Sequence, residues 1–123
     1  MKIRCTANHL RFRLGKSDVE RLAEHHSVRE TIHVAPGQSL AFELATAPID
    51  SIRASSQDNV VRIDIPQSAA RQWITTDEVG IEGQYTFSKG EVLNILIEKD
   101  FPCKHQPQEE KADTFQELAR KQG

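Results

Sequence analysis

The feature that most constrains the fold of this chain is a polarity pattern that occurs twice. When the sequence is aligned with itself at an offset of 51 residues, apolar positions of the first half fall on apolar positions of the second half. The matched pairs include Leu10 with Val61, Phe12 with Ile63, Leu14 with Ile65, Leu22 with Trp73 and Leu44 with Ile95. The match fails where Arg13 faces Asp64 and Leu40 faces Glu91. Each half therefore predicts the same unit, which is a hairpin, a short helix and a second hairpin.

Strand signals dominate both halves. His9–Leu14 alternates between apolar and charged residues, which is the period of a half-buried strand. Lys2–Thr6 precedes it, and the Ala7-Asn8 step suits a tight turn because Asn tolerates positive φ. The remaining predicted strands are 28–34, 40–44, 51–55, 60–65, 79–85 and 92–98.

Short helices are predicted after the first strand pair of each half. Residues 17–20 (Ser-Asp-Val-Glu) have the pattern of a capping box, and Pro66 suits the first turn of the second helix. A third capping-box pattern begins at Thr114, after a polar stretch. We therefore expect one domain over residues 1–103, and a polar linker with a short C-terminal helix over residues 104–123.

Length and composition limit how such a chain can bury its apolar surface. The chain has 123 residues, of which 37% are hydrophobic, enough for one modest core. Two ββαββ units that are too small to bury their own apolar faces can bury them against each other, and a closed or partly closed barrel would also remove exposed strand edges. The predicted fold is α+β and mostly strand, a small barrel-like domain made from two pseudo-symmetric ββαββ units.

The overall charge and hydropathy say little about a partner. The formal net charge is −2, which gives no general reason to expect nucleic-acid or membrane binding. No apolar run approaches the roughly 20 residues of a membrane span. Charged residues also interrupt the N-terminus where a signal peptide has its apolar segment. We therefore expect a cytoplasmic protein without membrane contact, and the sequence leaves its oligomeric state open.

Three segments of the second half carry a recognisable pattern: Ile65-Pro66, Asp77-Glu78-Val79 and residues 90–97. With these segments the second half resembles the AbrB-type swapped-hairpin regulators and antitoxins. In that family two chains intertwine, so the resemblance implies a fused duplication that is similar to such a dimer within one polypeptide. The chain departs from the family pattern at Thr75-Thr76-Asp77, where a Gly-Asp step is usual, and at Gly15, where the Pro would lie.

A longer resemblance extends over almost the whole chain up to Cys103. Its motifs are the opening residues 1–14, the helix start at 17–20, Val79-Gly80-Ile81-Glu82-Gly83, and Glu98-Lys99-Asp100-Phe101-x-Cys103. With these motifs the chain resembles a family of short bacterial proteins that have no assigned activity. The resemblance therefore implies a family and no function.

The N-terminal segment is the first candidate for a binding surface. All its charged residues up to position 17 are cations, namely Lys2, Arg4, Arg11, Arg13 and Lys16. A hairpin would place several of them on one side, where such clusters bind phosphate backbones; the AbrB resemblance likewise implies DNA contacts by basic residues near the N-terminal strands. The alternative is an ordinary solvated strand face, whose cations Glu20, Glu30 or Glu43 could neutralise. We interpret the chain as a non-enzymatic binding or regulatory module for nucleic acid or protein.

The second interpretation is a metal- or thiol-dependent protein centred on Cys103 and His105, with Cys5 as a further ligand if the fold brings it close. These residues are suitable ligands for Zn²⁺ or Cu, and the cations beside Cys103 would favour its thiolate. Paired C-x₂-C or H-x₃₋₅-H spacing is absent, however, so the expectation is no cofactor and two free thiols.

Conventional enzyme motifs are also absent. The sequence has no P-loop, G-x-G-x-x-G, H-E-x-x-H or G-x-S-x-G pattern. Glu98 and Asp100 share one strand face, and paired carboxylates can perform acid–base chemistry, but such pairs also end many strands as solvated charge. The sequence therefore names no catalytic residue and favours a role other than catalysis.

Overall fold

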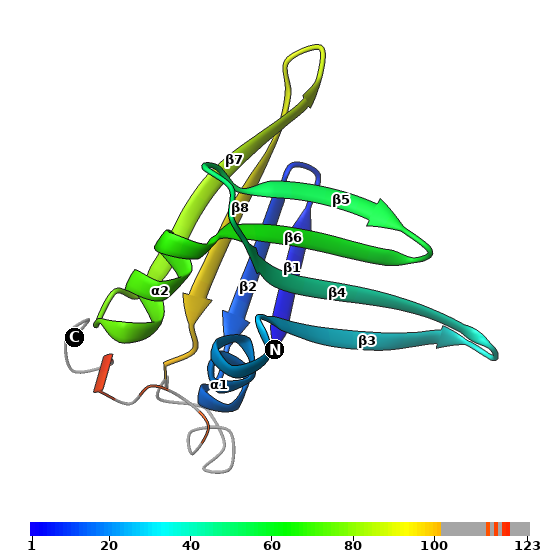
Figure 1. The fold of residues 1–123 in the computed structure, drawn as a ribbon. Coiled ribbons are helices and arrows are strands. Elements are labelled where there is room, and N and C mark those ends of the chain that lie inside the picture. Colours follow the sequence, from blue (N-terminus) through cyan, green and yellow to red (C-terminus); the bar gives the residue numbers. More distant parts are fainter. Residues whose placement is uncertain (102–112, 114, 116, 119–123) are drawn as a thin grey trace.

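A computed structural model describes residues 1–101, 113, 115, 117 and 118 (Figure 1). Along this part of the chain a short hairpin, a helix and a longer hairpin follow one another, and this order occurs twice. In order they are β1 (Lys2–Thr6), β2 (His9–Leu14), α1 (Lys16–His25), β3 (Ser27–Ala35), β4 (Gln38–Ala47), β5 (Arg53–Gln57), β6 (Val60–Pro66), α2 (Gln67–Thr75), β7 (Gly80–Ser88) and β8 (Glu91–Lys99).

The strands form two four-stranded sheets that each combine hairpins from both halves of the chain (Figure 1). The first sheet has the order β1-β2-β8-β7, and the second sheet has the order β3-β4-β6-β5. Parallel pairing of β2 with β8 joins the halves in the first sheet, and parallel pairing of β4 with β6 joins them in the second. Neither half forms a sheet by itself, so the two halves are interlocked by exchange of their hairpins.

The two sheets have matching registers. His9 lies opposite Asn94 at one parallel junction, and Val60 lies opposite Ala41 at the other. Strands β1 and β2 correspond to β5 and β6 at the offset of 51 that the sequence predicts. Strands β3 and β4 correspond to β7 and β8 at an offset of 53, because the distance along the chain from the start of α2 to the start of β7 is two residues longer than that from the start of α1 to the start of β3. Leu44 therefore corresponds in position to Ile97, not to Ile95 as a constant offset predicts.

The predicted α+β, mostly strand class is confirmed, but the barrel is not closed. Within the described residues, β1 and β7 are the edges of the first sheet, and β3 and β5 are the edges of the second. The strands of the two sheets cross at a steep angle in Figure 1. In that arrangement each sheet buries its apolar face against the other sheet and the helices, so burial does not require hydrogen bonds between the sheet edges.

The core lies between the two sheets and beneath the helices. Phe12 of β2 and Phe42 of β4 meet edge to face, with ring centroids 6.3 Å apart and an interplanar angle of 66°. Leu22 of α1 and Trp73 of α2 are fully buried, and Trp73 Nε1 donates to the Val79 carbonyl at 3.0 Å. The core therefore joins residues from both halves, as the matched apolar positions predict.

The start of α1 differs from the predicted capping box. The helix begins at Lys16, so the Gly15 amide donates to Asp18 at 3.2 Å. The Ser17 hydroxyl instead donates to the Asp113 carboxylate at 3.1 Å. Because the helix starts earlier than residues 17–20 indicate, Asp18 takes the position that the prediction assigned to Glu20.

The predicted C-terminal segment lies largely outside the described residues. Of the described positions there, Leu118 is buried, and the Phe115 amide donates to the Asp100 carbonyl at 2.6 Å. No helix in the described part of the chain is long and apolar enough to cross a membrane.

Candidate functional site

The outer face of the first sheet carries four of the five predicted basic residues. Residues that lie opposite each other on neighbouring strands project from the same face of a sheet. The registers align Lys2 with Arg13 and Glu98, and they align Arg4 with Arg11, Leu96 and Glu82. The predicted gathering of Lys2, Arg4, Arg11 and Arg13 on one face therefore follows from strand pairing. We call these four residues the basic face.

Two carboxylates from the end of β8 lie among these cations. Glu98 Oε1 accepts a hydrogen bond from Arg11 Nε at 2.6 Å and lies 3.3 Å from Arg13 Nε. Asp100 lies 3.1 Å from Lys2 Nζ and 3.9 Å from Arg13 Nη1. Glu98 and Asp100 are only 8% and 5% exposed, so less water screens these pairs than ordinary surface pairs. The two carboxylates suggested for acid–base chemistry act here as partners of the basic face.

Arg4 stands apart from the other cations of the basic face. Its side chain is exposed, and it forms no ion pair with any residue that the structure describes. Its neighbour across the hairpin is Arg11, whose guanidinium is held by Glu98. The face therefore combines arginines fixed by carboxylates with one exposed arginine that is available to an anionic partner.

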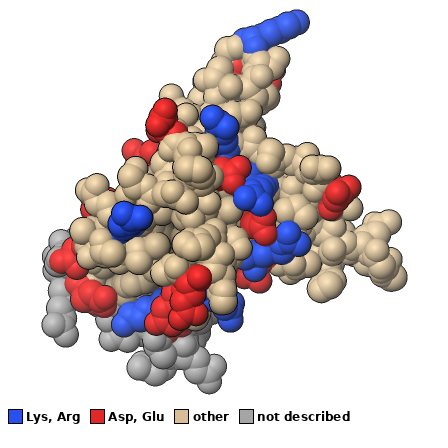
Figure 2. Space-filling view, in the orientation of Figure 1, with Lys and Arg blue, Asp and Glu red and all other residues tan. Residues whose placement is uncertain are grey.

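The second sheet carries a comparable row in which the charges alternate. Arg29 and Arg62 both contact Glu43, at 3.1 Å and 3.2 Å, and Arg62 also donates to Asp64 at 2.9 Å. Figure 2 shows blue and red side chains alternating over this sheet. The hydrogen bond to Asp64, together with the adjacent charge of Glu43, raises the pKa of the Arg62 guanidinium above its usual value. Each described arginine of this row thus has a carboxylate partner.

Lys16 is not on a strand of the first sheet and so is not part of the basic face. It is the first residue of α1, and its backbone amide donates to the Asp113 carbonyl at 3.1 Å. Two of the acidic residues expected to neutralise the basic hairpin have other partners. Glu43 pairs with arginines of the second sheet, and Glu30 pairs with the N-terminal amine. Glu98 and Asp100 have that role instead, because β8 is the parallel partner of β2, a pairing that local sequence does not reveal.

The N-terminal amine of Met1 is held between two carboxylates. It lies 3.0 Å from Asp18 of α1 and 2.9 Å from Glu30 of β3. Desolvation of the amine lowers its pKa, but hydrogen bonds to Glu30 and Asp18 and their charges outweigh desolvation, so the pKa is raised above 8.0. These contacts connect the start of β1 to α1 and β3.

We predict that this amine makes stability depend on pH in the alkaline range. Because the folded-state pKa lies above the unfolded value of 8.0, its contribution is fully present below pH 8.0 and is lost as the pH rises through the folded-state pKa. Urea unfolding from about pH 7 to about pH 10 should show this loss. The Asp18→Asn/Glu30→Gln variant should lose less stability than the unsubstituted chain over the same pH range. If the variant and the unsubstituted chain lose the same stability, the assignment to this amine is contradicted.

The candidate metal and thiol residues are only partly within the described chain. Cys103 and His105 lie outside the described residues. Cys5 is an exposed free thiol. It lies opposite Leu10 in the hairpin, whereas His9 lies opposite Thr6, so alternation places Cys5 and His9 on opposite faces of the sheet. The described residues contain no group of three His, Cys, Asp or Glu side chains arranged to hold a metal ion.

Comparison with known proteins identifies a family and nothing finer. A protein-family model matches residues 1–118, which include every strand and helix described above. No curated protein matches, and no solved structure matches. The resemblance to AbrB-type regulators is not shown by these comparisons, whereas the predicted membership of a family without assigned activity is confirmed. The chain belongs to the family described as a family of unknown function, DUF7009.

Proposed function

We propose that this chain is a non-enzymatic, cytoplasmic binding module that contacts the phosphate backbone of nucleic acid through the basic face. The observation that carries the proposal is the position of Arg4, an exposed arginine without an ion pair in the described chain, in register with Arg11. Cationic side chains that replace counterions on phosphates supply most of sequence-independent nucleic-acid affinity. Lys2, Arg4, Arg11 and Arg13 outnumber the carboxylates Glu98, Asp100 and Glu82 on this face.

The comparison between the two halves supports this choice of surface. At the offset of 51, Arg53, Ser55, Arg62 and Asp64 of the second hairpin occupy the positions of Lys2, Arg4, Arg11 and Arg13. The first hairpin thus has four cations where the second has two cations and one carboxylate. If the halves arose by duplication, as we infer from their equal registers, the first hairpin is the one specialised for an anionic partner.

The exchange of hairpins between the halves is a further support. It is the arrangement that a fused form of an intertwined AbrB-type dimer would have, and that resemblance implies DNA contacts through basic residues near the N-terminal strands. The ion pairs of Glu98 and Asp100 fit the same function, because they fix the guanidinium groups of Arg11 and Arg13 on the face that carries Arg4. A guanidinium held in place loses less conformational entropy when it binds phosphate.

We predict that Arg4→Ala weakens nucleic-acid binding more than any single change on the second sheet. Fluorescence anisotropy with labelled duplex DNA, single-stranded DNA and RNA should give an affinity that falls steeply with salt. Loss of one phosphate contact should reduce the slope of log K against log salt by about one unit. Arg4→Ala/Arg11→Ala should weaken binding further.

The control is Arg62→Ala, which removes the arginine of the second sheet at the position of Arg11 and should leave affinity unchanged. An equal loss in Arg62→Ala and Arg4→Ala would indicate a general charge effect and contradict the assignment to the basic face. If the intact chain binds none of the three nucleic acids even at low salt, the proposal that the basic face binds nucleic acid is wrong. An acidic protein surface then becomes the partner to test. The metal- or thiol-dependent alternative around Cys103 and His105 stays a prediction.

A further inference from the structure

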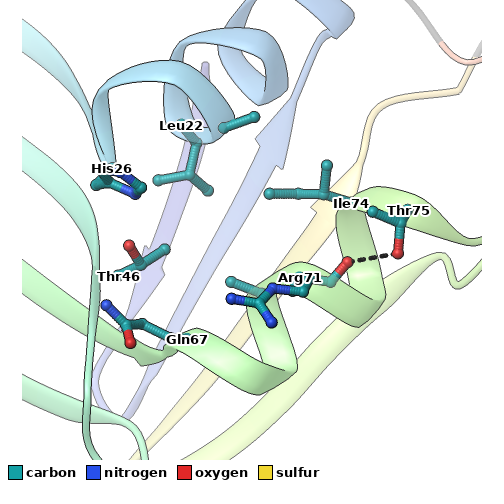
Figure 3. Close-up of a pocket in the computed structure, with 9 residues that line it drawn as sticks. Leu22, His26, Thr46, Gln67, Arg71, Ile74 and Thr75 are labelled. Atoms are coloured by element: carbon teal, nitrogen blue, oxygen red, sulfur yellow. Dashed lines mark hydrogen bonds between the residues drawn. The ribbon is translucent and has the colours of Figure 1, made fainter.

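A cleft of about 250 Å³ lies between α1 and α2, where elements from both halves of the chain meet (Figure 3). Leu22 of α1 and Ala70 and Ile74 of α2 supply apolar walls. His26, at the end of α1, and Thr46, in β4, lie on one side of the cleft. Ligand sites in proteins are commonly concave, mostly apolar and provided with a few convergent polar groups.

The polar ends in this cleft converge. In Figure 3 the side chain of Arg71 extends from α2 towards Gln67 and Thr46, and the His26 ring points into the same space. The Thr46 amide donates to the His26 carbonyl at 3.0 Å, which holds these two residues side by side. Four side chains that can donate hydrogen bonds therefore face one small volume.

Two of these groups have no partner among the described residues. Arg71 is exposed and, like Arg4, forms no ion pair with any described residue, whereas Arg11, Arg13, Arg29 and Arg62 each contact a carboxylate. The Thr46 hydroxyl oxygen is buried and makes no hydrogen bond with any described residue. A buried polar atom without a partner costs free energy that a bound group can recover. No Asp or Glu is among the described residues that line the cleft, so its charge favours an anion.

We propose that this cleft binds a small organic carboxylate with an apolar body. The carboxylate accepts hydrogen bonds from Arg71 and from the hydroxyl of Thr46, and His26 and Gln67 lie beside it. The apolar body packs against Leu22 and Ile74. An inorganic anion would leave these apolar walls uncovered, whereas a neutral apolar molecule would leave Arg71 and Thr46 without a partner. This site is separate from the basic face and does not depend on its function.

Because the cleft is made by α1, β4 and α2, its ligand contacts both halves of the chain. A ligand that binds only the folded state stabilises it in proportion to its concentration relative to its Kd. Carboxylate binding should therefore raise the melting temperature of the intact chain, which gives a readout that requires no knowledge of the activity.

The test uses the intact chain with benzoate, phenylacetate and hexanoate, each compared with its neutral amide. We expect at least one carboxylate to raise the melting temperature and to bind at least about tenfold more tightly than its amide, as a charge-assisted hydrogen bond predicts. Arg71→Gln should weaken that carboxylate by about tenfold or more, and Thr46→Val should weaken it by a smaller factor. Arg21→Gln, which removes an exposed arginine of α1 that does not line the cleft, is the matched control.

Two outcomes would overturn the proposal. In the first, none of the three carboxylates shifts the melting temperature or the NMR signals of Leu22 and Ile74 at millimolar concentration. In the second, a carboxylate binds Arg71→Gln as tightly as it binds the unchanged chain, or Arg21→Gln weakens it equally, so that attraction to general positive charge explains the binding.

Discussion

Fragments 1–50 and 51–123, produced separately, should each fail to fold as a monomer, and mixing them should restore the fold. Each fragment contains two hairpins whose structural partners lie on the other fragment, because β2 pairs with β8 and β4 pairs with β6. A separated fragment loses both parallel junctions and exposes the apolar face of each hairpin. Isolated two-stranded hairpins are marginally stable in water. Circular dichroism and the dispersion of amide NMR signals should report the loss and its recovery on mixing.

The oligomeric state of each separate fragment decides the interpretation of this experiment. A fragment that folds only as a homodimer still obeys hairpin exchange, since one copy then supplies the hairpins that the other copy lacks. A fragment that is folded and monomeric contradicts the interlocked arrangement. The intact chain at the same concentration is the reference, and sedimentation equilibrium distinguishes the two forms.

Phe12→Ala should lower the free energy of unfolding by about 3–5 kcal/mol, as expected for removal of a buried aromatic side chain. Phe12 is fully buried in the first sheet and contacts Phe42 of the second sheet. The truncation therefore leaves a cavity between the two sheets, at a place where surrounding strands cannot close it without changing their register. Urea unfolding followed by circular dichroism measures the change.

Phe87→Ala is the matched control, because the same atoms are removed from a side chain that is 54% exposed near the end of β7. Its effect should stay within about 0.5 kcal/mol, as is usual for surface positions. If both substitutions cost the same free energy, the contact between the sheets is not what stabilises the fold.

Much of the fold was predictable from the alternation of residues. The pattern of His9–Leu14 predicts which side chains face inwards, and Phe12 and Leu14 are indeed fully buried. The constant offset was wrong beyond the helices, because the chain from the start of α2 to the start of β7 is two residues longer than the corresponding stretch of the first half. Alternation repeats every two residues, so a shift by two preserves the inward and outward faces and leaves no signal in the pattern.

The cations of the basic face could be predicted from the sequence, but the carboxylates that pair with them could not. A hairpin is a local structure, so Lys2, Arg4, Arg11 and Arg13 could be placed on one face from sequence alone. The partner of Arg11 is Glu98, which is 87 residues away in the sequence. The cleft residues Thr46 and Arg71 carry no motif, and only their position between the helices distinguishes them.

The sequence by itself determined the amphipathic strands, the two short helices and the presence of two similar units, because each depends on side-chain polarity over a few neighbouring residues. The tertiary structure decided which hairpin pairs with which. Backbone hydrogen bonds are nearly independent of residue type, so any two strands of suitable length can form them. The choice of partner is made by the burial of Phe12, Ile63, Ile97 and Leu44 in one shared core, to which both halves contribute. That choice also brought Glu98 and Asp100 to the basic face and placed Arg71 across a cleft from Thr46.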